Sequence, residues 1–151
     1  MNFSIYNNFS NFKSIQIKEK KQYQNFIKHI FKYADEICFI ADPCLDTLEE
    51  LLDTKWNFLY KSAICYEYTP YVPYTSNSID LFPKCVLHLK TDYQTLEFFK
   101  NKTNIFDFDW SNGDRATGIM LVDPFFLHNG KVICSTLTHE QFLDVHPMII
   151  E

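Results

Sequence analysis

The chain has 151 residues, of which 46% are hydrophobic and 17% aromatic, and its formal net charge is −5. This length and composition suit one globular domain with an aromatic-rich core, and they exclude a disordered chain. We therefore expect a single domain over residues 1–151, in which residues 1–17 form a flexible or edge segment.

No signal peptide or transmembrane helix is recognisable in the sequence. The start, MNFSIYNNFS, lacks a basic region followed by an apolar one, and no later run approaches the roughly 18 apolar residues that span a bilayer. The five cysteines are odd in number and mostly lie in apolar runs, which favours buried free thiols over disulfides. We expect a soluble, cytoplasmic protein.

Charge is divided unevenly along the chain. Residues 1–34 contain six lysines and one glutamate, a net charge of +5. Of the 14 basic and 19 acidic residues in all, the rest of the chain therefore holds eight and 18, a net charge of −10. This acidic body disfavours general nucleic-acid binding, which depends on basic side chains displacing counterions, and it favours a basic protein partner.

The first predicted elements are helix, strand and helix. Residues 18–34 (KEKKQYQNFIKHIFKYA) place apolar side chains at spacings of three and four, which predicts an amphipathic helix. Residues 37–41 (ICFIA) are apolar without alternation, as in a short buried strand. Asp42 and Pro43 then suit the N-cap and first position of a helix over 42–54, with leucines on its buried face.

Strands dominate the second half of the chain. Strands are expected at 62–68 and 84–90, followed by a helix at 91–102 capped by Thr91 or Asp92. Strands at 116–123 and 131–137 are joined through PFFLHNG, which contains the Asn129-Gly130 turn. A capping box at Thr138 then starts a short helix that Pro147 stops. Strands that follow one another directly favour antiparallel pairing. The predicted fold class is α+β, a single domain with a mixed or largely antiparallel sheet of about five strands and about four helices.

The second predicted helix has an acidic face. Residues 35–54 contain seven acidic residues and no basic one. Charged faces of helices are usually just solvated, but a face without lysine partners lacks i,i+4 pairs and repels itself. Such a face suits a basic target. The residues expected to bind it are Asp46, Glu49, Glu50 and Asp53.

The segment NIFDFDWSNGDRATGIMLVDP, residues 104–124, suggests two chemical interpretations that fit poorly. Asp107, Asp109 and Ser111 have the every-second-residue spacing of a calcium loop. However, the chain has asparagine and glycine where the EF-hand requires glycine and then glutamate. A phosphatase-like Asp-x-Asp pair needs an apolar strand before it, and KNKTNIF precedes it instead.

A polar turn is the simplest interpretation of the same segment. Ser-Asn-Gly-Asp suits a tight turn before the strand expected from Ala116. Compatible with this turn is a functional interpretation in which Trp110, flanked by Asp107, Asp109 and Asp114, is an exposed anchor for a basic partner.

Tyrosines recur beside two prolines in TPYVPY, residues 69–74. On a stiff loop, Tyr71 and Tyr74 would lose little entropy on docking and would make good binding anchors. Alternatively, their rings pack onto the sheet as a lid, since burying aromatic area is itself favourable. The sequence leaves both interpretations open.

The sequence contains no established catalytic or metal-binding motif. Cys-x-x-Cys is absent, and Leu143 stands where a zinc-protease helix starting at His139 requires its second histidine. His139 and His146 lack a third ligand. One rival interpretation is a small enzyme with residues gathered from distant positions, namely Cys134, His139 and Asp123. We expect no cofactor and no metal.

The end of the chain resembles one known family. SNGDRATGIMLVDP (111–124) and NGKVICSTLTHEQFLDV (129–145) are similar to the end of the SUKH superfamily of bacterial immunity proteins. In that family a turn leads into a strand ending near Asp-Pro, a Gly-Lys-Val strand follows, and a final helix contains a Glu-x-Phe-Leu pattern. The resemblance implies an immunity protein that neutralises a toxin by binding it.

The leading hypothesis is thus an inhibitor without catalytic activity that blocks the active site of a basic, nuclease-type protein toxin. An acidic inhibitor is steered electrostatically onto such a partner. Neither nucleic acid nor membrane is expected as a partner. The expected partner-binding residues are Asp107, Asp109, Trp110, Asp114, Asp46, Glu49, Glu50, Asp53, Tyr71 and Tyr74. The alternatives are the small enzyme and an adaptor that dimerises through the Tyr-Pro loop.

Overall fold

The computed structural model describes residues 12–69, 73–75, 78–79, 84–108 and 112–150, and its centre is one seven-stranded antiparallel sheet. The strand order is β1-β9-β8-β7-β2-β6-β3. These strands are β1 (Lys13–Ser14), β2 (Glu36–Asp42), β3 (Ala63–Thr69), β6 (Lys84–Lys90), β7 (Met120–His128), β8 (Lys131–Leu137) and β9 (Phe142–Val145). A separate pair is formed by β4 (Pro73–Thr75) and β5 (Ser78–Ile79).

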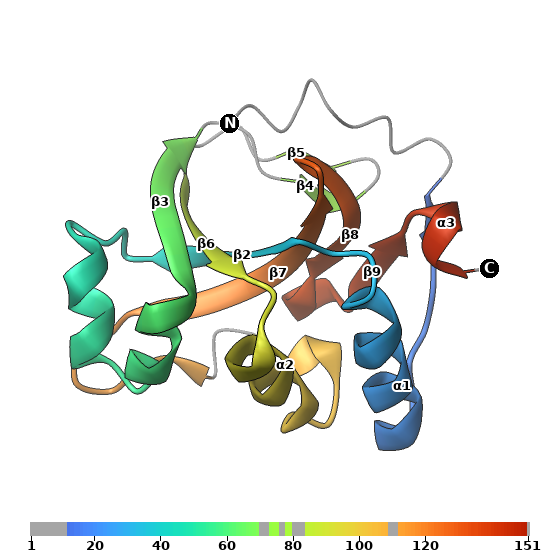
Figure 1. The fold of residues 1–151 in the computed structure, drawn as a ribbon, viewed down its shortest axis with the longest axis horizontal. Helices are drawn as coiled ribbons and strands as arrows, with labels where there is room; N and C mark the ends of the chain where they lie inside the picture. The colour runs from blue at the N-terminus through green and yellow to red at the C-terminus, as the bar shows by residue number, and fades with distance from the viewer. Residues whose placement is uncertain (1–11, 70–72, 76–77, 80–83, 109–111, 151) are drawn as a thin grey trace.

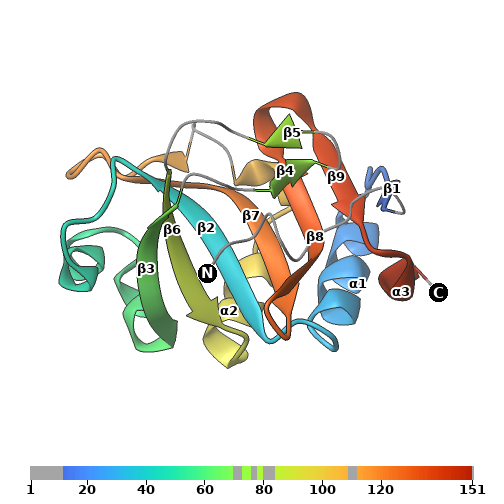
Figure 2. The ribbon, with the colours of Figure 1, turned by 90° about the horizontal axis from the view of Figure 1, so that it is seen from above.

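Helices α1 and α2 lie against one face of the curved sheet, and β4 and β5 lie on the other side (Figures 1 and 2). The helical elements are α1 (Lys20–Ile30), α2 (Tyr93–Lys100) and α3 (Pro147–Ile150), with 3₁₀ helices η3 (Leu48–Asp53), η4 (Asn57–Ser62), η5 (Ile105–Asp107) and η7 (Thr138–Glu140). This arrangement confirms the predicted α+β class in a single domain. None of the helices in the described part of the chain is long and apolar enough to cross a bilayer.

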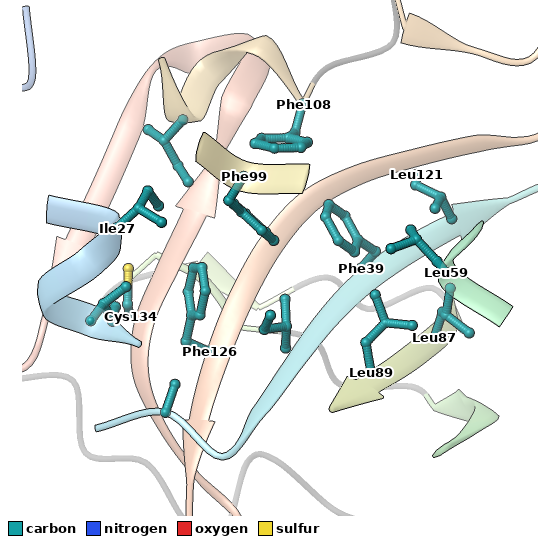
Figure 3. Close-up of a cluster of buried hydrophobic side chains, with 14 of the residues drawn as sticks. Ile27, Phe39, Leu59, Leu87, Leu89, Phe99, Phe108, Leu121, Phe126 and Cys134 are labelled. Carbon is teal, nitrogen blue, oxygen red and sulfur yellow. The ribbon is translucent and has the colours of Figure 1, made fainter. Parts of the chain in front are cut away.

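The main core fills the space between the sheet and the helices and is rich in phenylalanine (Figure 3). Phe99 of α2 lies at its centre, with its ring centroid 5.6 Å from Phe39, 4.7 Å from Phe108 and 5.3 Å from Phe126. Aromatic pairs at these separations add about 0.5–1.5 kcal/mol each beyond the area they bury. The aromatic-rich core expected from composition is therefore present.

Two elements follow directly from their sequence patterns. In α1, Tyr23, Ile27 and Ile30 are fully buried at spacings of four and three, as the amphipathic pattern predicts. The Tyr23 hydroxyl also donates a buried 2.5 Å hydrogen bond to the Phe99 carbonyl, which ties α1 to α2. Strand β2 is apolar without alternation because both its faces are covered, one by the main core and one by a second apolar cluster that includes Cys38.

The helix predicted over 42–54 is wrong. The chain leaves β2 at Asp42, whose peptide bond to Pro43 is cis. Within the predicted range 42–54, only Leu48–Asp53 is helical, as the 3₁₀ helix η3. The N-cap is Thr47, with no side-chain cap bond. A run of acidic residues without basic partners deprives an α-helix here of stabilising i,i+4 pairs. A short 3₁₀ helix, held by its packing on β3, forms instead.

The predicted last helix is also wrong. Its first turn exists only as η7, because the Thr138 hydroxyl donates to the Asp123 carboxylate and does not cap a helix. Gln141 then adopts a left-handed conformation (φ 58°), and the chain continues as strand β9 between β8 and β1. Pro147 begins α3 and does not end a helix.

The sheet has seven strands where about five were expected, because β1 and β9 were not predicted as strands. Both are short and lie at one edge of the sheet, where β1 pairs with β9 alone among the described residues. Short strands carry little periodicity, so pairing with a neighbour decides their conformation.

The hairpin of β7 and β8 turns at Asn129-Gly130, as predicted, with positive φ at both residues (51° and 78°). However, β7 begins at Met120 and runs through PFFLH, so the prediction of a strand at 116–123 followed by a loop is wrong. Asp123 has φ 51° at an irregularity opposite Phe39 of β2. A β-bulge accommodates the Pro124 nitrogen, which has no hydrogen to donate to the sheet.

Candidate functional site

Residues 46–53, which contain the predicted acidic residues, lie beside the edge strand β3. They form part of a surface that carries both acidic and apolar side chains. Asp46, Glu49 and Asp53 are exposed and Glu50 is half-buried. Two tyrosines hold the segment in place: the Tyr66 hydroxyl donates to the Asp46 carbonyl (2.5 Å), and the Tyr60 hydroxyl donates to the Glu49 carboxylate (3.4 Å). These two bonds anchor the short stretch of chain that contains all four predicted acidic residues.

Large apolar side chains are exposed next to these acids. Leu52 of η3 is 47% exposed, and Ile64 and Tyr68 of β3 are 44% and 68% exposed. Strand β3 is at one end of the sheet and, among the described residues, pairs only with β6 (Figure 2). We call this group the acidic-apolar surface; it consists of Asp46, Glu49, Glu50, Leu52, Asp53, Ile64 and Tyr68.

The predicted anchor loop lies partly outside the described residues, which exclude Asp109 and Trp110. Asp107 is described and half-buried. Its Oδ2 accepts hydrogen bonds from the Thr103 backbone and hydroxyl and from the Asn104 backbone, at 2.7–2.9 Å, and so completes the capping box of η5. The carboxylate of Asp107 is thus engaged in holding its own turn.

Asp114 is buried, with 7% of its surface exposed. It accepts hydrogen bonds from the Thr117 hydroxyl (2.7 Å), the Thr117 backbone (2.9 Å) and the Lys55 backbone (2.8 Å). These bonds, led by the one from the Thr117 hydroxyl, lower the pKa of Asp114 below that of an ordinary aspartate. The carboxylate therefore joins the loop to the turn before η4, which leaves it little freedom to meet a partner.

The Tyr-Pro loop is described only in part. Tyr71 lies outside the described residues, and Tyr74 lies in β4, whose backbone pairs with β5. Strand β4 contacts β8 on the face of the sheet away from the helices (Figure 2). The placement of β4 shows where this segment crosses the sheet. Whether the tyrosine rings are binding anchors or a lid on the sheet stays a prediction.

The structure describes the surroundings of two of the three residues in the rival enzyme hypothesis, Cys134 and Asp123. Cys134 is fully buried in the main core, and burial, with Asp144 nearby, raises the pKa of its thiol well above the usual value. A protonated buried thiol is a poor nucleophile. Asp123 accepts hydrogen bonds from the Thr138 backbone (2.8 Å) and hydroxyl (2.6 Å), and the His139 side chain lies outside the described part.

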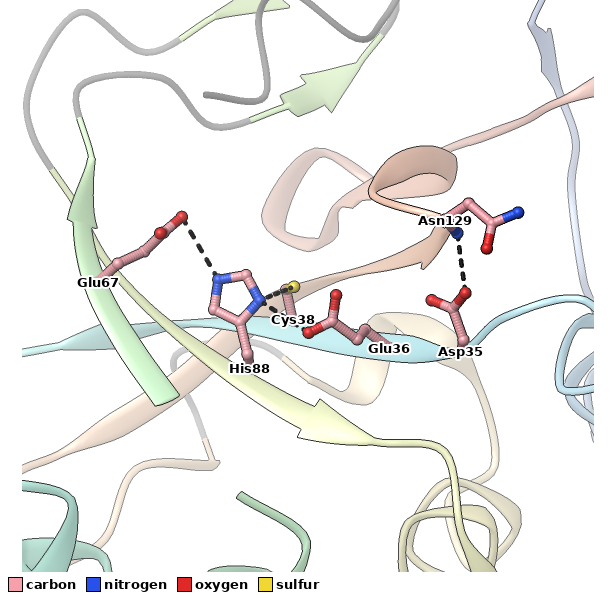
Figure 4. A network of polar contacts seen from close by, with 6 residues as sticks. All are labelled: Asp35, Glu36, Cys38, Glu67, His88 and Asn129. Atoms are coloured by element: carbon pink, nitrogen blue, oxygen red, sulfur yellow. Dashed lines mark hydrogen bonds and ion pairs between the residues drawn. The ribbon is translucent and has the colours of Figure 1, made fainter. Parts of the chain in front are cut away.

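A different cysteine, histidine and carboxylate cluster does form, on the face of the sheet away from α1 and α2 (Figure 4). His88 of β6 is paired across the strands with Cys38 of β2 and Cys65 of β3. Its Nδ1 lies 3.3 Å from the Cys38 sulfur and 3.6 Å from a Glu36 oxygen, and its Nε2 lies 3.4 Å from a Glu67 oxygen. Three neighbouring strands thus bring together groups that are far apart in sequence.

The chemistry of this cluster favours structure over nucleophilic catalysis. His88 is 2% exposed and Cys38 is fully buried. Burial first, and then the negative charges of Glu36 and Glu67, raise the pKa of the Cys38 thiol well above its usual value. The geometry resembles that of a cysteine with its base, but the raised pKa of the thiol disfavours the thiolate that nucleophilic catalysis requires. Among the described residues, no group of three or more such side chains is placed to hold a metal ion.

This cluster was not predicted as a unit from the sequence. KCVLHLK shows by its alternation that His88 shares a face with Val86, but nothing in the sequence gives the register that sets Cys38 and Cys65 beside it. Comparison with known proteins adds no family: no family model, curated protein or solved structure matches the chain.

Proposed function

We propose that this protein is an immunity protein that binds and neutralises a basic toxin, with the acidic-apolar surface as its docking site. The observation that carries the proposal is the grouping of four acidic side chains with exposed Leu52, Ile64 and Tyr68 at the edge strand β3. Protein interfaces combine apolar anchors with a charged rim in this way.

Each part of this surface has a separate role in binding. The apolar side chains supply area whose removal from water favours a complex. The carboxylates accelerate the approach of a positively charged partner and select against acidic ones.

Nuclease-type toxins are the class that this chemistry fits best. An active site that binds a phosphate backbone is lined with basic side chains. An acidic surface occupies such a cleft by the same attraction that draws its substrate. Inhibition then needs stoichiometric binding and no catalytic group on the inhibitor.

The first experiment is a pull-down of the tagged full chain from its native host, washed at low and then high salt, with the retained proteins identified by mass spectrometry. We expect one basic protein at equal stoichiometry, held less strongly as salt rises because screening weakens exposed charge pairs. Direct titration of the purified pair then gives its dissociation constant.

A charge-matched pair of variants locates the site. Asp46→Asn with Asp53→Asn removes two exposed charges from the acidic-apolar surface, and Glu19→Gln with Glu140→Gln removes two exposed charges elsewhere. We expect the first variant to weaken binding by roughly tenfold or more and the second by less than about twofold. Equal losses in both variants would show that net charge alone matters. Loss in neither would reject this surface as the docking site.

A further inference from the structure

A second candidate site is a pocket of about 390 Å³ between η4 and α2. Its walls include Lys55 and Trp56 from the turn before η4, Phe58 from η4, Phe98 from α2, and Asn101 and Lys102 from the turn after α2. Small-molecule pockets typically enclose roughly 300–1,000 Å³, so this one suits a compact ligand. It shares no residue with the acidic-apolar surface and does not depend on the function proposed for that surface.

Aromatic rings form one side of the pocket. Phe58 is 40% exposed and meets Phe98 edge to face, with ring centroids 5.4 Å apart. Phe98 meets Phe108 of the main core in the same way, also at 5.4 Å. Because Phe98 is held by the core behind it, the pocket offers a fixed apolar wall against which a flat group can lie.

Two lysines stand over these rings. The Lys55 ammonium lies 5.1 Å from the centre of the Trp56 ring, and the Lys102 ammonium lies 5.7 Å from the centres of both Phe98 and Phe108. In this part of the chain, as far as it is described, no carboxylate forms an ion pair with either lysine. The pocket's own glutamate, Glu97, is paired with Lys100 at 3.5 Å.

The two ammonium groups also feel each other's charge. Partial burial, and then repulsion from Lys102, lowers the pKa of Lys55, while Asp114 acts in the opposite direction. An anion placed between the two lysines would relieve this repulsion and neutralise part of their charge. The side chains of Gln94 and Asn101 add hydrogen-bonding groups to the same walls.

We propose that this pocket binds a small organic anion with a planar apolar body, its charged group between Lys55 and Lys102 and its ring against Phe58 and Phe98. Nucleoside monophosphates and aromatic carboxylates share this chemistry. The charge requirement comes from the lysines and the planar body from the aromatic wall, so a ligand with only one of these features binds less well.

The test is calorimetric titration of the full chain at low salt with four probes: adenosine monophosphate, naphthalene-2-carboxylate, inorganic phosphate and uncharged adenosine. At least one of the first two should bind at least roughly tenfold more tightly than phosphate and adenosine. Which of the two binds more tightly distinguishes a nucleotide from a carboxylate ligand. Binding of neither at about 10 mM, or phosphate binding as tightly as both, would overturn the proposal.

Matched variants place the ligand. Lys55→Gln and Lys102→Gln should each weaken binding of the aromatic anion by roughly tenfold, and Phe58→Leu should weaken it while leaving phosphate unaffected. Lys61→Gln is the control, because it removes the same charge from an exposed position at the end of η4 without lining the pocket. Melting curves verify that each variant is folded. If Lys61→Gln loses as much affinity as the other lysine variants, general attraction to a basic surface explains binding and the proposed pocket is wrong.

Discussion

Two of the aspartates expected at a binding surface, Asp107 and Asp114, also hold the local structure of their own turns. Asp107 completes the capping box of η5, and Asp114 binds backbone groups on two sides of a loop. Short carboxylates in turns form such bonds readily because nearby backbone N–H groups lie within reach. By contrast, the carboxylates of Asp46 and Asp53 are on the outer side of their segment and stay exposed.

Asp114→Asn should lower stability in a pH-dependent way. The hydrogen bonds to Asp114 lower its pKa in the folded protein, so the stabilisation is complete above the pKa of an unfolded aspartate and is lost as pH falls through the lower folded value. Urea denaturation from about pH 6 to about pH 3 should show the wild type losing its advantage over the variant at the acidic end. Asp46→Asn is the control, since Tyr66 binds its carbonyl and not its carboxylate. An advantage that does not change with pH would contradict the assigned role.

The cysteines should divide into two classes by reactivity. Cys44 and Cys65 are exposed, whereas Cys38, Cys85 and Cys134 are buried, so the expectation of buried thiols holds for three of the five. We expect two thiols to react with a disulfide reagent in the folded protein and the other three only after unfolding. Cys65 should react more slowly than Cys44 and accelerate as pH rises, because burial and then Glu67 raise its pKa. Rapid reaction of a third thiol in the folded protein would contradict the structure, and Cys44→Ser and Cys65→Ser identify the reacting sites.

At the scale of elements, local capping signals were reliable only where the capping bonds form in the folded chain, which is not the case at Thr138. Helix α2 is the clearest case, because Asp92 and Thr95 form a reciprocal capping box at its start. The Asp92 carboxylate also accepts a 2.6 Å hydrogen bond from Ser62, which links α2 to the end of η4. A single side chain therefore both starts the helix and anchors it to its neighbour.

Asp92→Ala should destabilise the protein by about 1–2 kcal/mol, because it removes the cap and leaves the buried Ser62 hydroxyl without its acceptor. Asp92→Asn should retain most of the stability, since asparagine caps helices about as well as aspartate. The free energies of unfolding in urea decide between these outcomes. Equal losses in both variants would show that the charge, and not the cap geometry, is what α2 requires.

At the scale of the whole molecule, acidic and basic side chains are concentrated towards opposite edges of the sheet. The acidic-apolar surface lies beside β3 at one edge of the sheet, whereas the lysine-rich helix α1 packs nearer the opposite edge, towards β9 (Figure 1). This separation gives the molecule an electric dipole along the sheet. A basic partner is therefore drawn to one end of it.

This charge separation leads to a prediction about the kinetics of partner binding. Raising ionic strength from about 50 to 500 mM should slow association by roughly tenfold or more and change dissociation much less, because steering acts before contact. Stopped-flow or surface-based kinetics measures both rates. The Asp46→Asn, Asp53→Asn variant should show a shallower dependence of the association rate on salt than the Glu19→Gln, Glu140→Gln control. An association rate that is independent of salt would contradict electrostatic steering.

The sequence by itself determined the α+β class, the amphipathic helix α1, the buried strand β2, the capped helix α2 and the Asn129-Gly130 hairpin turn. Each of these depends on periodicity or on hydrogen bonds within a few residues, so the information is local. Only the tertiary structure decided that residues 142–145 extend the sheet, that 42–54 forms no α-helix, and that His88 meets Cys38 and Glu67. Strand register and long-range packing supply the free energy for these features, and no pattern within a single short segment encodes them.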